Sequence, residues 1–229
     1  MSATEYGRGS VMITSNHNPY LLYLVTDDQQ NLTTLEHVIR EAIAGGVTMV
    51  QIREKHGDVR AFIQRAQTVK AILQQAYTAT GRHIPLIIND RVDVALAVDA
   101  DGVHLGQTDM PVTMARQLLG KDKLIGLSIE TEQQLLDCAS QPIDYIGLSA
   151  IFATTTKTNL ITHWGLDGLQ RAAAICPFPI VAIGGINHTN LTKVMTAGAD
   201  GIAIVSAISH ADNPCQATAE ILAAISSSK

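Results

Sequence analysis

Asp90 and Asp109 are the residues of this sequence best suited to hold a metal ion. Each follows a short apolar run of strand character, 84–88 for Asp90 and 101–105 for Asp109. Because the carboxyl ends of parallel strands share one face, both carboxylates are expected on that face. Two converging carboxylates repel unless a proton or a cation lies between them. Mg²⁺ takes one or two carboxylates together with waters and substrate phosphates, so the pattern predicts one Mg²⁺ ion at this pair.

Each of the two aspartates also has a structural interpretation. Asp90 could cap the helix that follows it. Asp109 could lie in a turn before Pro111. Taken singly, these are the commoner roles, so the metal hypothesis depends on the rest of the chain.

Phosphate-binding residue types follow the apolar run 47–52. Gln51, Arg53 and Lys55 alternate along the chain, so in extended backbone their side chains point the same way. Arginine offers a planar fork to a phosphate and lysine a point charge. The alternative is a solvated Arg-Glu-Lys turn. Taken alone, that turn is the commoner interpretation, although a strand that is apolar through Ile52 and then places two cations on one side is less usual.

Two further segments have the composition of anion sites. The run Thr154, Thr155, Thr156 and Lys157 combines hydroxyls, loop amides and an ammonium, although a flexible polar loop explains it equally well. Gly184-Gly185 before a helix, with Val205-Ser206 after the next apolar run, matches the phosphate site that barrels often build after strands 7 and 8. The alternative for the glycine pair is a tight turn.

Eight apolar runs alternate with eight helical periodicities from Tyr20 to the end of the chain. The expected strands are 20–25, 47–52, 84–88, 101–105, 124–127, 143–148, 179–183 and 201–205. The expected helices are 33–45, 58–77, 91–100, 114–119, 131–139, 166–175, 189–197 and 216–225, the first opened by a Thr33/Glu36 capping box. Near-continuous apolar strands indicate a parallel sheet covered on both faces.

This order predicts an α/β protein with a single-domain (β/α)₈ TIM barrel over residues 20–229, preceded by a poorly ordered polar arm over residues 1–19. An open doubly wound sheet is the alternative, but no G-x-G-x-x-G follows the first strand. His104 lies inside a strand and is expected to be a packed, hydrogen-bonded barrel residue and not a base.

The composition of the sequence limits the kinds of partner that the protein is expected to bind. The formal net charge of −5 argues against nucleic acid and anionic membranes as partners. No apolar run approaches the ~20 residues of a membrane span, and residues 1–20 do not resemble a secretory signal. The three cysteines are scattered and lack metal-ligand spacing, so we expect a cytoplasmic protein with reduced thiols. A homo-oligomer is compatible with the sequence.

Motifs after most of the expected strands match those of one family. The chain resembles the thiamine phosphate synthase (thiamine-phosphate pyrophosphorylase) family. The matching stretches are 23–27 (YLVTD), 50–55 (VQIREK), 88–93 (INDRVD), 102–109 (GVHLGQTD), 125–128 (IGLS), 154–157 (TTTK), 182–186 (AIGGI) and 205–206 (VS). The chain departs from the family where Ser149-Ala150 replaces a frequent Gly-Pro and Ala153 a frequent Pro.

The resemblance implies a (β/α)₈ barrel and a Mg²⁺-dependent transferase. Its reaction joins 4-amino-2-methyl-5-hydroxymethylpyrimidine diphosphate to a thiazole phosphate, giving thiamine phosphate and diphosphate. We expect the pyrimidine methylene to carry positive charge as diphosphate leaves, and the thiazole nitrogen to capture it. Such chemistry requires no strong protein base and no covalent nucleophile.

The resemblance also assigns residues by position. Asp90 and Asp109 are implied as the Mg²⁺ ligands. The residues implied at the pyrimidine diphosphate are Gln51, Ile52, Arg53, Glu54, Lys55, Asn89, Ser128 and Lys157. Those implied at the thiazole phosphate are Thr154, Thr155, Thr156, Gly185, Val205 and Ser206. Arg53, Lys55, Lys157 and Ser128 are expected to be the catalytic ones.

Two other functions would use the same binding residues. A thiazole tautomerase would use the same barrel but needs a general base, usually histidine, near the end of the fifth strand. This chain has Ser128 and then Glu130 there, and it keeps both aspartates. A non-catalytic thiamine phosphate sensor would need the binding residues alone, and the aspartate pair argues against it.

Overall fold

Eight parallel strands close into a barrel in the order of the chain. The computed structural model describes residues 18–153 and 163–227. The strands are β1 (Leu22–Val25), β2 (Met49–Ile52), β3 (Leu86–Asn89), β4 (Gly102–Leu105), β5 (Leu124–Ile129), β6 (Tyr145–Ser149), β7 (Ile180–Ile183) and β8 (Gly201–Ile204). Each strand pairs with the next in parallel register, and β8 pairs with β1. The predicted (β/α)₈ barrel is therefore confirmed.

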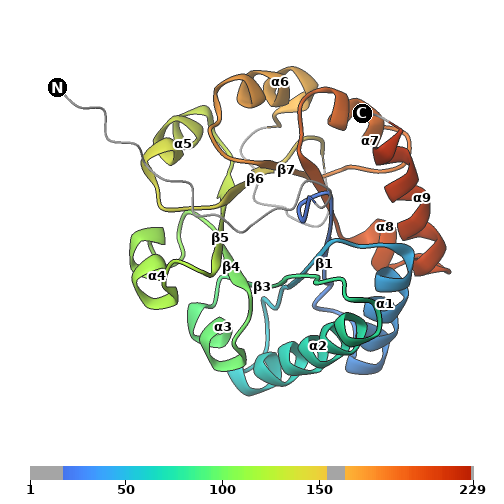
Figure 1. Cartoon of the computed structure of the whole chain (residues 1–229). Helices are drawn as coiled ribbons and strands as arrows, with labels where there is room; N and C mark the ends of the chain where they lie inside the picture. The colour runs from blue at the N-terminus through green and yellow to red at the C-terminus, as the bar shows by residue number, and fades with distance from the viewer. Residues whose placement is uncertain (1–17, 154–162, 228–229) are drawn as a thin grey trace.

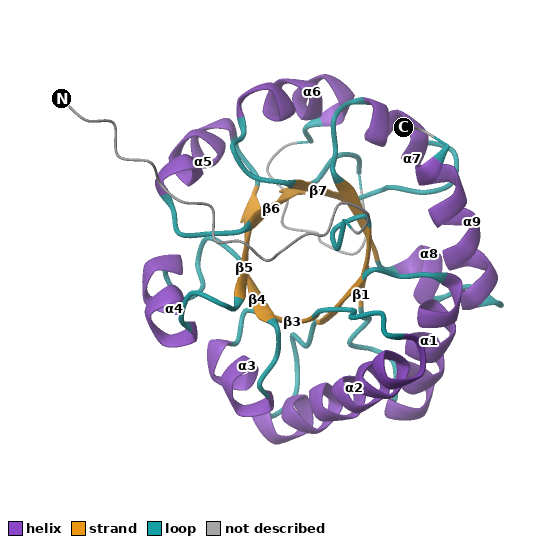
Figure 2. Cartoon of the chain, in the orientation of Figure 1, coloured by secondary structure: helices purple, strands orange, loops and turns teal. Residues whose placement is uncertain are grey.

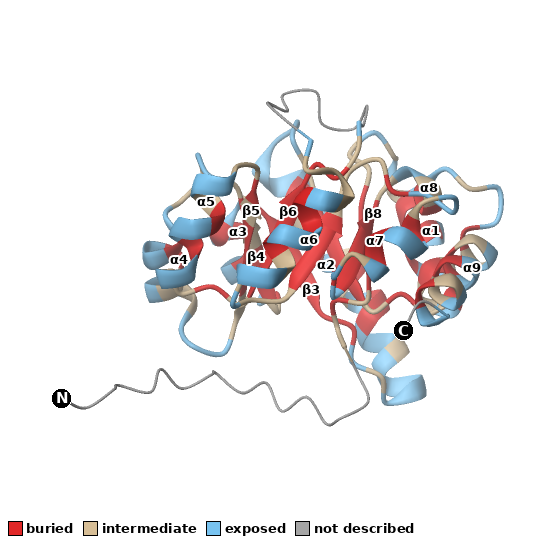
Figure 3. Cartoon of the chain, turned by 90° about the horizontal axis from the view of Figure 1, so that it is seen from above, coloured by how far each residue is buried: buried red, intermediate tan, exposed pale blue. Residues whose placement is uncertain are grey.

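Helices surround the barrel on its outside (Figures 1 and 2). They are α1 (Leu32–Gly45), α2 (Val59–Thr80), α3 (Val92–Val98), α4 (Val112–Leu119), α5 (Glu132–Asp137), a 3₁₀ turn η1 (Cys138–Ser140), α6 (Gly165–Ile175), α7 (Leu191–Thr196), α8 (Ser206–Ser209) and α9 (Pro214–Ser226). The strands are buried between these helices and the lumen, while the outer helix faces are exposed (Figure 3). This burial on two sides explains why the strands are apolar almost throughout.

The core has two parts. The larger lies between barrel and helices, and the smaller fills the lumen with Tyr20, Tyr23, Val25, Met49, Ile87, Tyr145, Val181 and Ala203. The barrel is thus packed through its centre and is not a pore.

A repeated hydrogen bond closes the amino-terminal end of the barrel. A polar side chain just before each even-numbered strand accepts a bond from a backbone N–H at the start of the preceding odd-numbered strand. The pairs are Thr48 with Leu22 (2.9 Å), Asp101 with Leu86 (2.8 Å), Asp144 with Ile125 (2.7 Å) and Asp200 with Ile180 (2.8 Å). Each bond satisfies a partly buried donor at a strand end.

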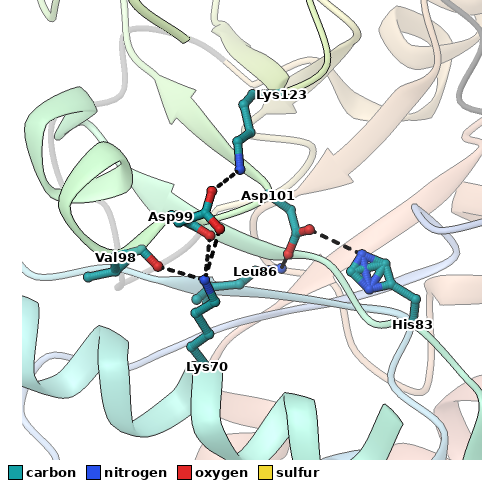
Figure 4. Close-up of polar contacts among 7 residues, drawn as sticks. All are labelled: Lys70, His83, Leu86, Val98, Asp99, Asp101 and Lys123. Atoms are coloured by element: carbon teal, nitrogen blue, oxygen red, sulfur yellow. Dashed lines mark hydrogen bonds and ion pairs between the residues drawn. The ribbon is translucent and has the colours of Figure 1, made fainter. Parts of the chain in front are cut away.

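The α3–β4 connection shows the same structural use of charge (Figure 4). Asp99 ends α3 in the left-handed region (φ 49°). The Lys70 ammonium bonds the carbonyls of Val98 and Asp99 at 2.8 Å each, and Lys123 bonds the Asp99 carboxylate at 2.5 Å. Lys123, and then Lys70 through a bond of 3.3 Å to the same carboxylate, lower the pKa of Asp99. Polar residues at this end serve stability, leaving the opposite end for chemistry.

One local prediction was wrong. Asn31, and not Thr33, caps α1, because its side chain accepts a bond from the Thr34 N–H at 2.9 Å. Ser206 follows the last strand as expected, and it opens the short helix α8, for which no prediction was made. The remaining differences are shifts of a few residues at element ends, where side-chain caps decide the boundary.

Candidate functional site

Lys55 and Asp90 form an ion pair at the carboxyl ends of β2 and β3. The Lys55 ammonium bonds the Asp90 carboxylate. Asp90 lies in the left-handed region (φ 61°), and its N–H donates to the His104 carbonyl at 2.9 Å. The suggested capping role is wrong, because Arg91 holds the N-cap position of α3 and no side chain caps that helix. The backbone turn instead directs Asp90 to the Lys55 side of the barrel end.

Asp109 lies beside Asp90, as the metal hypothesis requires. The pKa of Asp109 is raised, mainly by burial and secondly by the neighbouring Asp90 carboxylate. Its Oδ2 also accepts the Gly106 N–H at 2.7 Å, so the expected turn exists as well. The turn is therefore compatible with the position of Asp109 beside Asp90, because the bond from the Gly106 N–H holds the Asp109 carboxylate that faces Asp90.

The donor set fits Mg²⁺ better than a transition metal. Among the described residues no group of three or more His, Cys, Asp or Glu side chains gathers to ligate an ion. A site with two carboxylates leaves coordination positions for waters and phosphate oxygens, as Mg²⁺ usually requires. Asp90 already binds one cationic group, the Lys55 ammonium, so the position of the two aspartates favours positive charge.

Arg53 and Lys55 are held by the end of β1. The Arg53 N–H donates to the Thr26 hydroxyl at 3.0 Å, and the Lys55 N–H to Asp28 at 3.2 Å. Burial opposes ionisation of Asp28, but bonds from the Gln29 side chain and the Lys55 backbone outweigh it and lower its pKa. The β1–α1 loop thus fixes the backbone that carries both cations.

The intervening residues of this segment face elsewhere. Ile52 is fully buried in the core between barrel and helices. Glu54 accepts a bond from Arg65 of α2 at 2.6 Å, and burial raises its pKa although Arg65 opposes this. Of the predicted substrate residues in 51–55, Ile52 therefore uses its side chain for packing and Glu54 for an ion pair with Arg65.

Asn89, Gln51 and Ser128 bring neutral hydrogen-bonding groups to the same end. Asn89 is 6% exposed, and its Nδ2 has no hydrogen-bond partner among the described residues. A buried amide donor without a partner indicates a missing acceptor, such as a ligand or a water. Gln51 bonds the Tyr23 hydroxyl at 2.7 Å, and Ser128 bonds His104 at 3.0 Å. His104 is thus hydrogen-bonded within the barrel, as expected.

The glycine pair after β7 forms the opposite side of the site. Gly184 and Gly185 both have positive φ, 103° and 64°. A Cβ on Gly184 would lie 2.6 Å from the Ala150 Cβ, and one on Gly185 would lie 2.5 Å from the Ala153 carbonyl. Only glycine fits both the dihedral angles and this approach, so the pair is more than a turn: the β6 loop packs directly on it.

The remaining predicted residues divide between described and undescribed parts of the chain. Val205 is half-buried and precedes α8, and Ser206 is exposed as its first residue. Thr154, Thr155, Thr156 and Lys157 lie outside the described residues, as does most of the expected arm (residues 1–17). The described segment before them ends at Ala153, whose carbonyl lies against Gly185.

Sequence reasoning assigned no role to Tyr23 and Tyr145, which bond each other; Tyr23 also bonds Gln51, and Tyr145 bonds His104. A signal existed, because tyrosine is unusual in otherwise aliphatic barrel strands. Interpreting it requires knowing which residues face the lumen in the same layer.

Cations, carboxylates and a glycine-lined loop at the carboxyl ends of barrel strands define an enzyme of the phosphate-binding (β/α)₈ class. Residues 22–208 match the family model described as thiamine monophosphate synthase. The chain belongs to this family, and it is a transferase of thiamine biosynthesis.

Individual relatives agree with the family match. The chain is 64% identical over 205 residues to a thiamine-phosphate synthase from Vibrio parahaemolyticus, covering 90% of this chain and 98% of the relative. It is 49% identical over 197 residues to one from Albidiferax ferrireducens, covering 86% and 87%. A solved thiamine phosphate pyrophosphorylase from Pyrococcus furiosus superposes with a TM-score of 0.80 at 33% identity, covering 92% and 98%.

Within 18–153 and 163–227, no helix combines the length and the apolar character needed to cross a bilayer.

Proposed function

We propose that the chain condenses 4-amino-2-methyl-5-hydroxymethylpyrimidine diphosphate with a thiazole phosphate at the barrel end formed by β2 to β5, with one Mg²⁺ ion held by Asp90 and Asp109. The observation that carries this proposal is the convergence of the two carboxylates with Lys55. The reaction is inferred from the family, and the site offers a place where the negative charge of a diphosphate could be neutralised.

Charge neutralisation is the main task of the site. Diphosphate leaves readily only when its negative charge is stabilised, most of all as that charge grows during bond breaking. Mg²⁺ bound at the aspartate pair would supply Lewis-acid stabilisation of the diphosphate oxygens. Arg53 and Lys55, held by the β1–α1 loop, would bind the same oxygens by charge-assisted hydrogen bonds. Lys157 is placed in this role by sequence alone.

The heterocycle is proposed to lie over the lumen. Gln51, Asn89 and Ser128 bring amide and hydroxyl groups to that position, and the partnerless Asn89 amide supports a ligand there. The electron-rich aminopyrimidine could then carry positive charge on its methylene while diphosphate departs. The thiazole nitrogen captures that carbon, and no protein group forms a covalent bond.

The second substrate is proposed to bind on the β7–β8 side. Gly185, Val205 and Ser206, with Thr154, Thr155 and Thr156, would hold the thiazole phosphate through backbone amides and hydroxyls. Holding two substrates face to face removes much of the entropic part of the barrier. Water must also be kept from the methylene, because water would compete with the thiazole nitrogen for that carbon.

A two-substrate assay tests this function. Purified protein, both substrates and Mg²⁺ should give thiamine phosphate and diphosphate in equal amounts, and a chelator should stop both. Asp90→Ala should lower turnover by about 10² or more. Asp93→Asn is a matched control, because Asp93 is exposed, pairs with Arg91 and lies outside the carboxylate pair. Normal turnover in both Asp90→Ala and Asp109→Ala would defeat the proposed site.

We further propose the cytoplasm as the location. All three cysteines are free, and two of them, Cys138 and Cys176, lie close enough for the thiols to interact. Neighbouring thiols that stay unpaired fit a reducing compartment.

A further inference from the structure

Five side chains from five strands form one hydrogen-bonded chain across the barrel lumen. Gln51 Nε2 bonds the Tyr23 hydroxyl at 2.7 Å, and the Tyr23 hydroxyl bonds that of Tyr145 at 3.0 Å. Tyr145 bonds His104 Nδ1 at 3.1 Å, and His104 Nε2 bonds Ser128 Oγ at 3.0 Å. Its two ends, Gln51 and Ser128, are residues proposed above to contact the pyrimidine.

Two glycines make room for this chain. A Cβ on Gly126 would lie 2.2 Å from the Tyr145 ring and 2.4 Å from His104 Nδ1. A Cβ on Gly147 would lie 2.9 Å from His104 Cε1. Neither glycine has positive φ, so the backbone does not demand glycine at these positions. Glycine is needed because the side chains of Tyr145 and His104 occupy the space that a Cβ would fill. Strands β5 and β6 are therefore shaped around the hydrogen-bonded chain.

Counting protons gives the chain a direction. The Gln51 amide donates to Tyr23, so the one proton of Tyr23 is available for Tyr145. If Tyr145 donated to Tyr23 instead, the Tyr23 proton would face a buried environment unpaired, which costs free energy. Tyr23 and Tyr145 are 1% and 0% exposed, and burial raises both pKa values, so both phenols keep their protons.

The same count continues to the far end. Tyr145 accepts from Tyr23 and donates to His104 Nδ1. A neutral imidazole with an accepting Nδ1 carries its proton on Nε2. That proton donates to Ser128 Oγ, so the Ser128 hydroxyl keeps its own proton for another partner. At the other end, the Gln51 amide group has used one N–H and retains its carbonyl oxygen.

We propose that this chain sets the donor and acceptor pattern offered to the heterocycle, with Ser128 as a donor and the Gln51 carbonyl as an acceptor, and that Tyr23, Tyr145 and His104 are positioning residues. The pattern suits an aminopyrimidine, whose ring nitrogens accept and whose exocyclic amine donates. This inference rests on the proposed function, because it takes Gln51 and Ser128 as pyrimidine contacts. It assigns no acid or base role to His104.

The His104 tautomer tests the direction without any substrate. Nitrogen NMR of protein labelled with ¹⁵N-histidine, assigned by loss of a signal in His104→Gln, should show a protonated Nε2 and a bare Nδ1. In Gln51→Glu, an ionised carboxylate can only accept hydrogen bonds, so the Tyr23 hydroxyl must donate to it. Every hydrogen bond of the chain then reverses its direction. The proton should move to Nδ1. If that variant fails to fold, Tyr23→Phe removes the constraint and should populate both tautomers.

Kinetics test the positioning role. Tyr23→Phe should raise the KM for pyrimidine diphosphate roughly tenfold, the effect of one misplaced hydrogen bond. The KM for thiazole phosphate should stay within roughly twofold. Tyr20→Phe is the matched control, because the Tyr20 ring packs against that of Tyr145 with ring centroids 5.1 Å apart but lies outside the hydrogen-bonded chain. It should leave both KM values and the tautomer unchanged.

Each outcome bears on a different part of the proposal. A proton on Nδ1 in the native protein overturns the direction, and equal KM values in Tyr23→Phe and Tyr20→Phe overturn the positioning role. If the tautomers behave as stated but Gln51→Ala and Ser128→Ala both leave pyrimidine binding intact, the chain is real and the proposed pyrimidine site is wrong. A tautomer shift together with a KM effect confined to the pyrimidine supports the proposal.

Discussion

The carboxylates of Asp90 and Asp109 lie beside each other at the carboxyl ends of adjacent strands β3 and β4, and Lys55 bonds the first of them. Like charges held together in this way are unfavourable for the metal-free protein and favourable for binding a cation. The pair therefore predicts opposite effects of one substitution on stability and on activity.

Asp109→Asn should stabilise the metal-free protein at neutral pH while removing Mg²⁺-dependent turnover. The amide keeps an oxygen for the Gly106 N–H and removes the repulsion from Asp90. We expect a Tm increase of roughly 2 °C, measured by thermal unfolding in chelator. A lower Tm together with normal turnover would contradict the arrangement described here.

Protons should compete with Mg²⁺ for this site. Because the pKa of Asp109 is raised, the native state binds more protons than the unfolded state between the ordinary aspartate pKa and the raised value. The free energy of unfolding of the metal-free protein should therefore fall as pH rises through that window. Apparent Mg²⁺ affinity should rise over the same window, which titration calorimetry at several pH values would measure. An affinity independent of pH would count against Asp109 as a ligand.

Asp144→Ala should destabilise the barrel without changing its chemistry. Asp144 accepts from the Ile125 N–H at 2.7 Å and from Arg116 at 2.6 Å, at the end away from the site. Leaving these donors unpaired should cost about 2–3 kcal/mol in denaturant unfolding. The kcat of folded protein should be unchanged. Asp122→Ala, an exposed aspartate at the same end, should cost less than about 0.5 kcal/mol.

Gly185→Ala should disturb the thiazole phosphate side of the site. The new Cβ would collide with the Ala153 carbonyl and the Phe152 Cβ, displacing the segment that follows β6. We expect the KM for thiazole phosphate to rise by roughly tenfold or more. Gly81→Ala controls for backbone strain, because Gly81 has a similar φ of 71° and open space around it. Equal kinetic effects in both variants would show that strain alone is responsible.

Sequence patterns could place the aspartate pair because the rule involved is topological. Parallel strands bring their carboxyl ends together, so residues after two apolar runs meet whatever the details of packing. The same rule placed Arg53, Lys55 and the glycine pair at one end. It could not separate Glu54, whose partner Arg65 belongs to α2, from its neighbours that face the site.

Other features depended on details that periodicity does not carry. Asn31 and Thr33 are both good helix caps, and local backbone geometry chose between them. The lumen chain needed the register of β1, β4, β5 and β6, which brings Tyr23, His104, Ser128 and Tyr145 into contact. Helix α8 has four residues and is too short for a periodic signal.

Manganese binding tests the central claim most directly. Mn²⁺ can replace Mg²⁺ at oxygen sites and is counted by electron paramagnetic resonance, independently of turnover. With pyrimidine diphosphate present, the native protein and Asp93→Asn should each bind one ion tightly, and Asp90→Asn with Asp109→Asn combined should bind none. One tightly bound ion in that double variant would contradict the account.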